Sequence, residues 1–430
     1  MTGEGSLPFL VGAATAEITP LLQVGILMSA ARRQWAPFAG VRSPLFARAL
    51  VLANGGRRVA LVSLDLLGIC GKAFGGRARF KARIVAAAHG AVRPTDLILT
   101  ATHTHSAPET LCLTDLCRTR PFKRWVKDLA DRIGHAVSCA AERMEPCRLR
   151  TVSAEAPGLA IHRRIKTTRG VVLSSPEPAP ETVLSRAGAV DPAVNVAAFT
   201  RGTGEVLALL VGACCHPVHE MCLPFISADY PGEMCAELES RHPGATVFFF
   251  NGAAGNINPP TVSSGPDDAK VHGQKLATVV EEALARTGGS PLGPKARGRS
   301  SSPAQSFAEA TMVLKRRPVL LPGRTPGGRP SKLAVRTGIA GLRLGGVLLV
   351  FIPGEPFVEI GLAIRDASPF AATWIVGYAE DYVGYIPTRQ AFDEGGYELG
   401  PGAWARVGRG SEAVLLRAAR ALMRSLQVKG

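Results

Sequence analysis

The sequence lacks the features that would place a protein in a membrane or in an oxidising compartment. No stretch of about 18 uncharged apolar residues occurs, so no transmembrane helix is expected. The first residues show no basic region followed by a long apolar run, and we predict no secretory signal peptide. The nine cysteines are odd in number and form no Cys-x-x-Cys pair, which argues against a disulfide framework. Together these absences predict a cytoplasmic protein with reduced thiols.

Aromatic and charged residues are also scarce, at 6% and 20% of the chain. The few aromatics give no sign of a lipid-binding rim. The net charge of +16 is spread through the chain without a Lys/Arg block interleaved with aromatics, so no nucleic-acid partner is expected. An anionic small-molecule substrate stays open. With 430 residues, of which 46% are hydrophobic, the chain can build one large domain or two ordinary ones.

Strand-like and helix-like segments alternate along the chain, which is typical of the α/β class. Short apolar runs bounded by turn residues predict strands, and apolar residues at helical spacing predict helices. The strands are expected at 96–100, 206–215 and 246–250, with hairpins at 51–67 and 339–352. The helices are expected at 81–89, 122–144, 231–240, 267–287 and 412–426.

Two stretches rich in Gly and Pro predict exposed connections. The one at 288–303 would separate 1–287 from 304–430 within a single domain that covers 1–430. The other lies at 322–330. No internal repeat is evident, so the chain is not a repeat array.

Two histidines, His103 and His105, directly follow the predicted strand at 96–100. Because side chains on a strand alternate with period two, both are expected to point to the same side at its end. Two imidazoles on one face suit a divalent metal, zinc above all. The alternative is that one histidine is structural and the other an ordinary hydrogen-bonded side chain.

Three further clusters carry reactive groups, and each has a structural alternative. His216 and Glu355 each follow a predicted strand, Glu355 after a Pro-Gly pair that typically presents a carboxylate into a cleft. Tyrosines spaced through 378–397 could equally be core aromatics. Cys214 and Cys215 precede His216, but adjacent strand residues face opposite ways, so both cannot reach one ion. We expect both to be buried as small apolar side chains.

Taken in order, these clusters resemble the catalytic domain of the neutral, non-lysosomal ceramidase family over nearly the whole chain. The resemblance implies an α/β fold of mixed β-sheets flanked by helices. It would form one large catalytic domain without the immunoglobulin-like C-terminal domain of longer family members. The matching segments are 11–20, 62–68, 102–106, 216–217, 226–232, 353–356 and 385–398.

The resemblance implies a zinc ion held by His103, His216, Glu355 and Tyr385. Two neutral imidazoles, a carboxylate and a phenol oxygen are acceptable zinc ligands and leave room for a water molecule. His105 matches a family residue beside the metal that contacts the scissile group of the substrate.

Other matched positions are implied to support catalysis. Tyr397 matches the family tyrosine that helps to polarise the amide carbonyl. The family's arginine segment matches Arg163 or Arg164, and the sequence does not decide between them, since either could form a structural salt bridge. Asp229 and His219 are candidates for groups that orient a ligand imidazole.

One departure from the family changes the expected chemistry. The family's Gly-Asp-Val-Ser-Pro-Asn is Gly-Asn-Ile-Asn-Pro-Pro at 255–260, so Asn258 stands in place of the active-site serine. An amide cannot act as a nucleophile as a hydroxyl can, but it can donate a hydrogen bond to a developing oxyanion. Hydrolysis is therefore expected to run through metal-activated water, with His105 as the acid–base group.

The favoured interpretation is a zinc-dependent hydrolase that cleaves an amide bond of a small, soluble and potentially anionic substrate; ceramide itself is not expected. One alternative uses the same site for amide formation, acyl transfer or ring closure in a biosynthetic pathway, which a closed, dry pocket would favour. A second is a non-catalytic binding protein stabilised by zinc. The sequence leaves the substrate, the direction of the reaction and the oligomeric state open.

Overall fold

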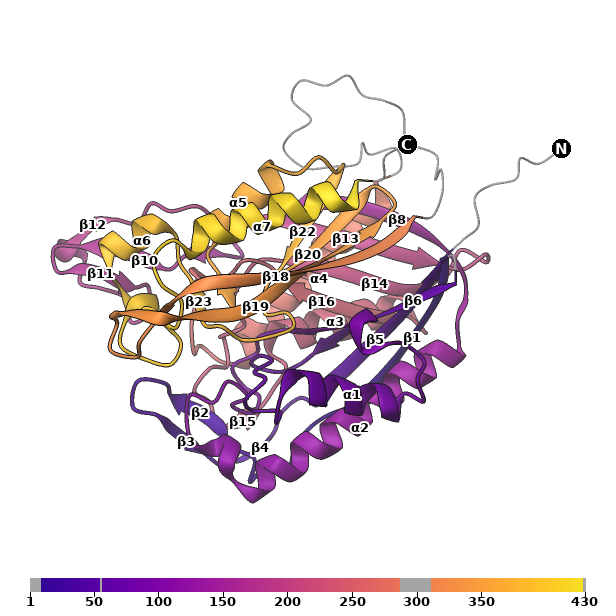
Figure 1. Cartoon of the computed structure of the whole chain (residues 1–430), viewed down its shortest axis with the longest axis horizontal. Coiled ribbons are helices and arrows are strands. Elements are labelled where there is room, and N and C mark those ends of the chain that lie inside the picture. Colours follow the sequence, from indigo (N-terminus) through magenta and orange to yellow (C-terminus); the bar gives the residue numbers. More distant parts are fainter. Residues whose placement is uncertain (1–8, 55, 287–310, 428–430) are drawn as a thin grey trace.

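The computed structural model describes residues 9–54, 56–286 and 311–427, so the connection predicted at 288–303 lies outside the described residues. Two β-sheets pack face to face and helices cover both outer sides (Figure 1). This arrangement confirms the predicted α/β class with mixed sheets flanked by helices.

The larger sheet has eight strands and is mostly antiparallel. Its two edge pairs, β16–β14 and β6–β7, are parallel. The strand order is β16 (Thr246–Asn251), β14 (Val206–Ala213), β13 (Ala193–Thr200), β8 (Glu145–Glu155), β1 (Phe9–Glu17), β5 (Phe46–Asn54), β6 (Arg57–Leu64) and β7 (Leu97–Ala101).

The smaller sheet has four strands and also ends in a parallel pair, β20–β22. Its order is β18 (Met312–Arg324), β19 (Pro330–Leu344), β20 (Val347–Phe351) and β22 (Ala372–Val376). The predicted hairpins at 51–67 and 339–352 are both present, as β5–β6 and β19–β20.

The alternation of side chains along each strand separates the core into layers. On β5, Val51 packs toward the helices, whereas Leu50 and Leu52 pack between the two sheets. On β16, Phe248 and Phe250 likewise face the other sheet. Because each of these strands is buried on both faces, it appears in the sequence as a continuous apolar run.

Helices cover both outer faces. On the larger sheet, the predicted helix at 122–144 starts at a Thr119 cap, whose hydroxyl accepts a hydrogen bond from the Phe122 N–H. The helices on the larger sheet are α1 (Arg77–Ala87), α2 (Arg120–Glu142), α3 (Asp229–Arg241) and α4 (Pro266–Ala285). Those on the smaller sheet are α5 (Val358–Asp366) and α7 (Ser411–Leu426), and a short α6 (Arg389–Glu394) lies near the site.

Short strands organise the connecting segments. Two pairs matter for the site: β17 pairs with β9, and β21 pairs with β23. The short strands are β2 (Ile26–Ser29), β3 (Gln34–Ala36), β4 (Gly40–Val41), β9 (Ile161–His162), β10 (Arg164–Thr167), β11 (Gly170–Leu173), β12 (Val183–Ser185), β15 (Phe225–Ile226), β17 (Ile257–Asn258), β21 (Glu355–Pro356) and β23 (Tyr385–Ile386).

Two predicted boundaries are wrong. The loop expected at 322–330 is shorter, because β18 and β19 stay paired as far as Arg324 and Pro330. Proline is tolerated there because β18 is an edge strand. The helix expected at 81–89 spans Arg77–Ala87 instead. It ends before His89, whose φ of +50° is left-handed.

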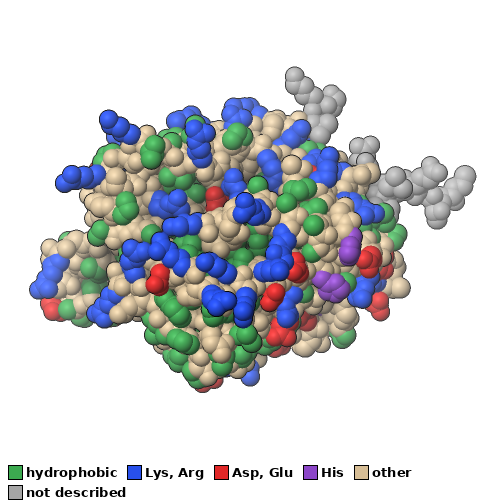
Figure 2. Space-filling model, turned by 60° about the horizontal axis from the view of Figure 1, so that its bottom comes forward, with side chains coloured by type: hydrophobic (Ala, Val, Ile, Leu, Met, Phe, Trp, Pro, Cys, Tyr) green, Lys and Arg blue, Asp and Glu red, His purple; other side chains and the backbone are tan. Residues whose placement is uncertain are grey.

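Positive side chains are spread over much of the face drawn in Figure 2, while acidic side chains gather mainly toward one side of it. This distribution fits the absence of a concentrated Lys/Arg block in the sequence. Within the described residues, no helix combines the length and apolar character needed to cross a membrane.

Candidate metal centre

The ends of several parallel strands meet at one place, where Asn251 ties them together. Its side-chain amide donates to the Thr102 carbonyl beyond β7, at 3.2 Å, and to the Cys215 carbonyl beyond β14, at 3.0 Å. Its own main-chain carbonyl accepts from the Gly377 N–H beyond β22, at 2.9 Å. The segments that follow these strands are therefore held side by side. As predicted, Cys214 and Cys215 are buried on opposite sides, in different apolar clusters.

His103 and His105 are brought together, although not by strand alternation as expected. β7 ends at Ala101, and His103 has a φ of +73°, which no strand residue adopts. The Nε2 atoms of the two imidazoles nevertheless lie 3.3 Å apart. The backbone turn after β7, rather than the alternation of side chains along a strand, sets this geometry.

His216 and Glu355 complete a compact group with His103. The Oε2 atom of Glu355 lies 3.4 Å from Nε2 of His103 and 3.2 Å from Nε2 of His216. All three side chains are at most 2% exposed. Candidate ligand atoms of His103, His105 and His216 all lie within 4.8 Å of one another, so these three could hold a metal ion.

Main-chain carbonyls fix both imidazoles in a ligand-like orientation. Nδ1 of His103 lies 2.5 Å from the Leu67 carbonyl, and Nδ1 of His216 lies 2.9 Å from the Ile257 carbonyl. A carbonyl can only accept, so each Nδ1 carries the proton and each Nε2 presents a lone pair. Metal-bound histidines are commonly oriented in this way.

The group fits a metal ion better than it fits hydrogen bonding within the protein. Although Glu355 Oε2 lies near two imidazole nitrogens, it is buried and has no hydrogen-bond partner among the described residues. Zinc bonds of about 2.0–2.1 Å in a tetrahedral arrangement place ligand atoms about 3.3–3.4 Å apart. The distances from Glu355 to His103 and His216 come close to this spacing. The residues present therefore fit zinc.

The electrostatics keep the candidate ligands in the states that bind metals. Burial, together with the charge of Arg163, lowers the pKa of His216 to about 4. Burial would raise the pKa of Glu355, but positive charge and hydrogen-bond donation at His103 and His216 lower that pKa well below its usual value. A bound cation would supply the same positive charge with both rings neutral. A neutral imidazole beside an ionised carboxylate is the combination that a divalent cation requires.

Tyrosines surround the carboxylate. Tyr385 is paired with Glu355 in the parallel β21–β23 register, and burial raises its pKa well above the usual value. The hydroxyl of Tyr382 donates to Oε1 of Glu355 at 2.8 Å. Tyr378 stacks on the His103 ring, with 4.1 Å between ring centres. Sequence reasoning singled out neither Tyr378 nor Tyr382, because their spacing alone does not distinguish them from core aromatics.

The two adjacent arginines face different sides, and Arg163 is the one at the site. Its Nη1 lies 3.4 Å from Nε2 of His216 and 3.4 Å from Oδ1 of Asn258. Arg164 points into a separate cavity. The buried Glu398 binds both guanidinium groups, at 3.0 Å from Arg163 and 2.6 Å from Arg164. Glu398 was missed because a glutamate next to Tyr397 carries no sequence signal of its own.

Asn258 and Tyr397 lie around Arg163. Asn258 is held on β17, which pairs with β9 through Ile161. The Arg163 guanidinium lies 6.0 Å from the centre of the Tyr397 ring. Tyr397 is 37% exposed, and His105 is also partly exposed, so these two side chains mark the open side of an otherwise buried group.

Two predicted orienting residues lie elsewhere. The carboxylate of Asp229 accepts from the main-chain N–H groups of Glu220 and Tyr230 instead of an imidazole. His219 contacts His272, with 3.0 Å between their nitrogens. Both expectations are wrong for the same physical reason, since main-chain carbonyls already orient the candidate ligands.

Comparison with known proteins agrees with this fold. No protein-family model matches the sequence. The neutral ceramidase of Pseudomonas aeruginosa is 28% identical over 279 residues, which are 61% of this chain and 39% of that protein. The alignment thus spans well under half of the relative. A crystal structure of neutral ceramidase from the same organism matches 99% of this chain and 76% of that chain, with a TM-score of 0.73.

This chain has the fold of the neutral ceramidases. A second structure, a ceramidase complexed with C2, also matches 99% of this chain and 77% of that chain, with a TM-score of 0.74 and 19% identity. The first structure is 21% identical. At these identities the structural likeness establishes the shared fold alone. The resemblance inferred from the order of the sequence motifs is confirmed.

Proposed function

We propose that this chain is a zinc-dependent hydrolase that cleaves an amide bond of a small-molecule substrate. The observation that carries the proposal is the convergence of His103, His216 and Glu355, with two lone pairs and an unpartnered carboxylate oxygen aimed at one point. The similarity to neutral ceramidase supports amide hydrolysis as the reaction class.

In this proposal His103, His216, Glu355 and Tyr385 hold the ion. Bound there, zinc supplies Lewis acidity for a carbonyl and lowers the pKa of water towards about 7. The buried Glu355 supplies the negative charge, and the Tyr382 hydroxyl holds its other oxygen in place. Their burial excludes bulk water, which strengthens each of these interactions.

The remaining side chains handle protons and charge. His105 takes a proton from the attacking water and returns it to the leaving amine, since burial and the neighbouring imidazoles keep its pKa well below the usual value. Arg163 stabilises the negative charge that develops on the carbonyl oxygen. Its Nη2 is buried and has no partner among the described residues. Asn258 and Tyr397 add hydrogen bonds there.

The substrate enters from the side of His105 and Tyr397, the partly exposed members of the group. Arg164 is fully engaged by Glu398, Glu394 and the Gly395 carbonyl. Arg163, by contrast, keeps at the site an Nη2 without a partner in the described part of the chain. We therefore expect the recognised acidic group, if the substrate has one, to lie close to the scissile amide, within reach of Arg163.

A direct test screens a panel of N-acyl amino acids and other small N-acyl compounds. The protein is used zinc-loaded, stripped by a chelator and reloaded. We expect only the zinc-loaded forms of the protein to convert a substrate of the panel into its acid and its amine. In heavy-oxygen water, the label should enter the acid product. Turnover that survives complete stripping would contradict the proposal, as would a product formed by joining acid and amine under the same conditions.

A further inference from the structure

A second cavity lies beside the candidate metal centre and carries two thiols. It has a volume of about 450 Å³ and is lined by Cys70 and Cys112, from the loops after β6 and β7. Tyr382 lines the same cavity, and its hydroxyl reaches Glu355 of the metal centre. The proposed hydrolysis uses neither cysteine.

The two loops that carry these cysteines are fastened together. The Thr110 hydroxyl donates to the Gly68 carbonyl at 2.7 Å, and the Gly68 N–H donates to the Thr110 hydroxyl at 3.2 Å. Gly68 also lies so close to Leu111 that an added Cβ would come within 2.4 Å of its side chain. Cys70 and Cys112 each lie two residues beyond this pair of hydrogen bonds, and both line the same cavity.

The wall around the thiols is strongly positive. Lys72, Arg324, Arg336 and Arg406 line the cavity with them. Asp381, the one acidic residue among those lining it, already forms an ion pair with Arg77 at 3.2 Å. A thiolate is the reactive form of cysteine, and a lining with four cations favours it. The charge of Asp381 acts the other way and raises the pKa of Cys70.

The Cys70 thiol also differs in pKa from the exposed thiol of Cys222 and from that of Cys112, whose pKa the interaction with Cys70 raises above its usual value. The hydrogen bond from Cys112 outweighs burial and lowers the pKa of Cys70 to about 7. Burial raises the pKa of Cys222, although that residue is exposed overall. If solvent exposure decided the reaction with an oxidant, Cys222 would react first. If the fraction of thiolate decided it, Cys70 would react first.

We propose that Cys70 and Cys112 form a redox-active pair, a modification site that hydrogen peroxide converts into a disulfide. The Cys70 thiolate attacks one peroxide oxygen, the O–O bond breaks, and the departing hydroxide takes up a proton as water. Cys112 then attacks the sulfur of the resulting sulfenic acid. The S–S bond forms, the S–O bond breaks, and a second water leaves with the Cys112 proton. The two thiols lose two electrons and peroxide gains them.

The test maps the cysteines chemically and needs no enzymatic activity. Reduced full-length protein is exposed to a small molar excess of hydrogen peroxide, then denatured and alkylated, and its peptides are mapped without reduction. We expect a cross-linked peptide joining Cys70 to Cys112, with Cys222 alkylated. Cys117→Ser should keep the cross-link. Cys112→Ser should lose it and leave Cys70 as a sulfenic acid that dimedone traps.

Three results would overturn the proposal. One is full alkylation of Cys70 and Cys112 while Cys222 is oxidised, which would show that exposure alone decides. Another is a cross-link from Cys112 to Cys117 in place of Cys70. The third is a cross-link between Cys70 and another cysteine that forms in Cys112→Ser to the same extent as in the wild type. Because the readout is peptide mass, the outcome does not depend on whether the zinc-hydrolase proposal holds.

Discussion

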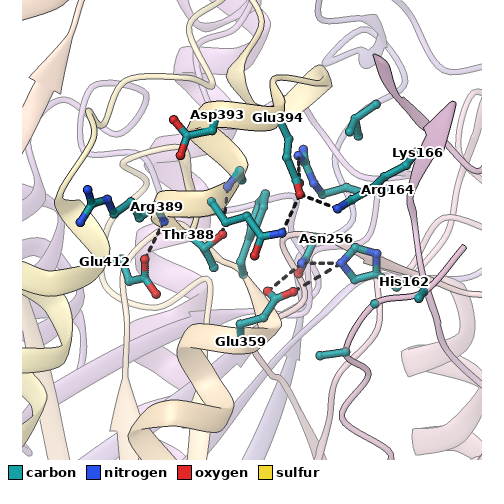
Figure 3. Close-up of a pocket in the computed structure, with 17 residues that line it drawn as sticks. His162, Arg164, Lys166, Asn256, Glu359, Thr388, Arg389, Asp393, Glu394 and Glu412 are labelled. Carbon is teal, nitrogen blue, oxygen red and sulfur yellow. Dashed lines mark hydrogen bonds and ion pairs between the residues drawn. The ribbon is translucent and has the colours of Figure 1, made fainter. Parts of the chain in front are cut away.

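Two polar regions lie beside the same pair of short segments, 161–164 and 256–258, and their charged groups are satisfied in different ways. Arg163 and Asn258 face the candidate metal centre. Arg164 and Asn256, one and two residues away, line an open cavity of about 790 Å³ (Figure 3). The larger opening therefore does not belong to the chemistry proposed above.

In the open cavity the charged groups pair with one another. Figure 3 shows Glu394 between Arg164 and Lys166, with 2.8 Å between its carboxylate and the lysine ammonium. Glu359 accepts from the Asn256 amide at 2.9 Å. At the metal centre, by contrast, the Glu355 carboxylate oxygen nearest the imidazoles has no hydrogen-bond partner in the described chain. Charged groups that pair with one another, as in the open cavity, stabilise the fold. The converging imidazole nitrogens and carboxylate oxygen of the metal centre have no protons to share, and a bound cation would satisfy them.

Replacing both imidazoles should give the largest difference between the two regions. The double variant His103→Ala/His216→Ala removes two candidate ligands, and we expect a loss of at least about a thousandfold in kcat/KM, together with the metal. His162→Ala in the open cavity should keep both. Rates are measured with the substrate found in the N-acyl panel. A double variant that retains metal and activity would refute the assignment.

The adjacent arginines offer a closely matched pair. Arg163→Gln should lower kcat/KM about a hundredfold, because it removes charge from the developing oxyanion. Arg164→Gln should leave kcat/KM within about threefold. Each variant leaves Glu398 with one guanidinium partner, so both should lose about 1–3 kcal/mol of unfolding free energy in a urea titration. Equal kinetic losses in the two variants would contradict the division between the regions.

Two tyrosines test the support of the carboxylate. Tyr382→Phe removes the hydroxyl that donates to Glu355, and we expect zinc affinity to fall about 10- to 100-fold. Tyr378→Phe should change it less than about twofold, because the Tyr378 hydroxyl has no partner within the described chain. Competition against a fluorescent chelator measures both. Matching losses would contradict a specific role for the hydrogen bond from Tyr382 to Glu355.

The smallest expected kinetic effect comes from the asparagines. Asn258→Ala should lower kcat about tenfold, since Arg163 and Tyr397 share its task. Asn256→Ala should leave kcat unchanged but cost about 1–3 kcal/mol of stability, because its side chain bonds both the Val358 N–H and Glu359. Thermal unfolding alongside initial rates separates the two. A kcat loss in Asn256→Ala alone would reverse our assignment.

Much of the fold follows from the sequence because its signals are local. Apolar runs predicted β5, β6, β7, β14 and β16 of the larger sheet and β19 and β20 of the smaller one, but not β1, β8, β13, β18 or β22. Cys214 and Cys215 are buried on opposite sides as expected, although the predicted strand at 206–215 ends at Ala213 and they lie in the segment after it. The grouping of His103 with His216 and Glu355 was accessible only through the order of motifs, since no local pattern shows that these strand ends meet. The cytoplasmic location and the lack of a nucleic-acid partner stay predictions.

What the sequence could not provide depends on contacts between distant segments. The choice of Arg163 over Arg164 depends on contacts with His216 and Asn258, which lie 53 and 95 residues after Arg163. The role of Asn251 could not be predicted because Asn-Gly is typical of a turn. In the structure its side chain and its main-chain carbonyl together join the segments that follow β7, β14 and β22. Main-chain carbonyls, which carry no sequence signal, took the orienting role expected of Asp229.

Elemental analysis of purified protein tests the central claim most directly. Wild type and His162→Ala should each contain about one equivalent of zinc per chain, and His216→Ala should contain none. That result would place the metal at the converging imidazoles and not in the open cavity. Wild-type protein without metal after zinc loading, or His216→Ala that retains a full equivalent, would contradict the account.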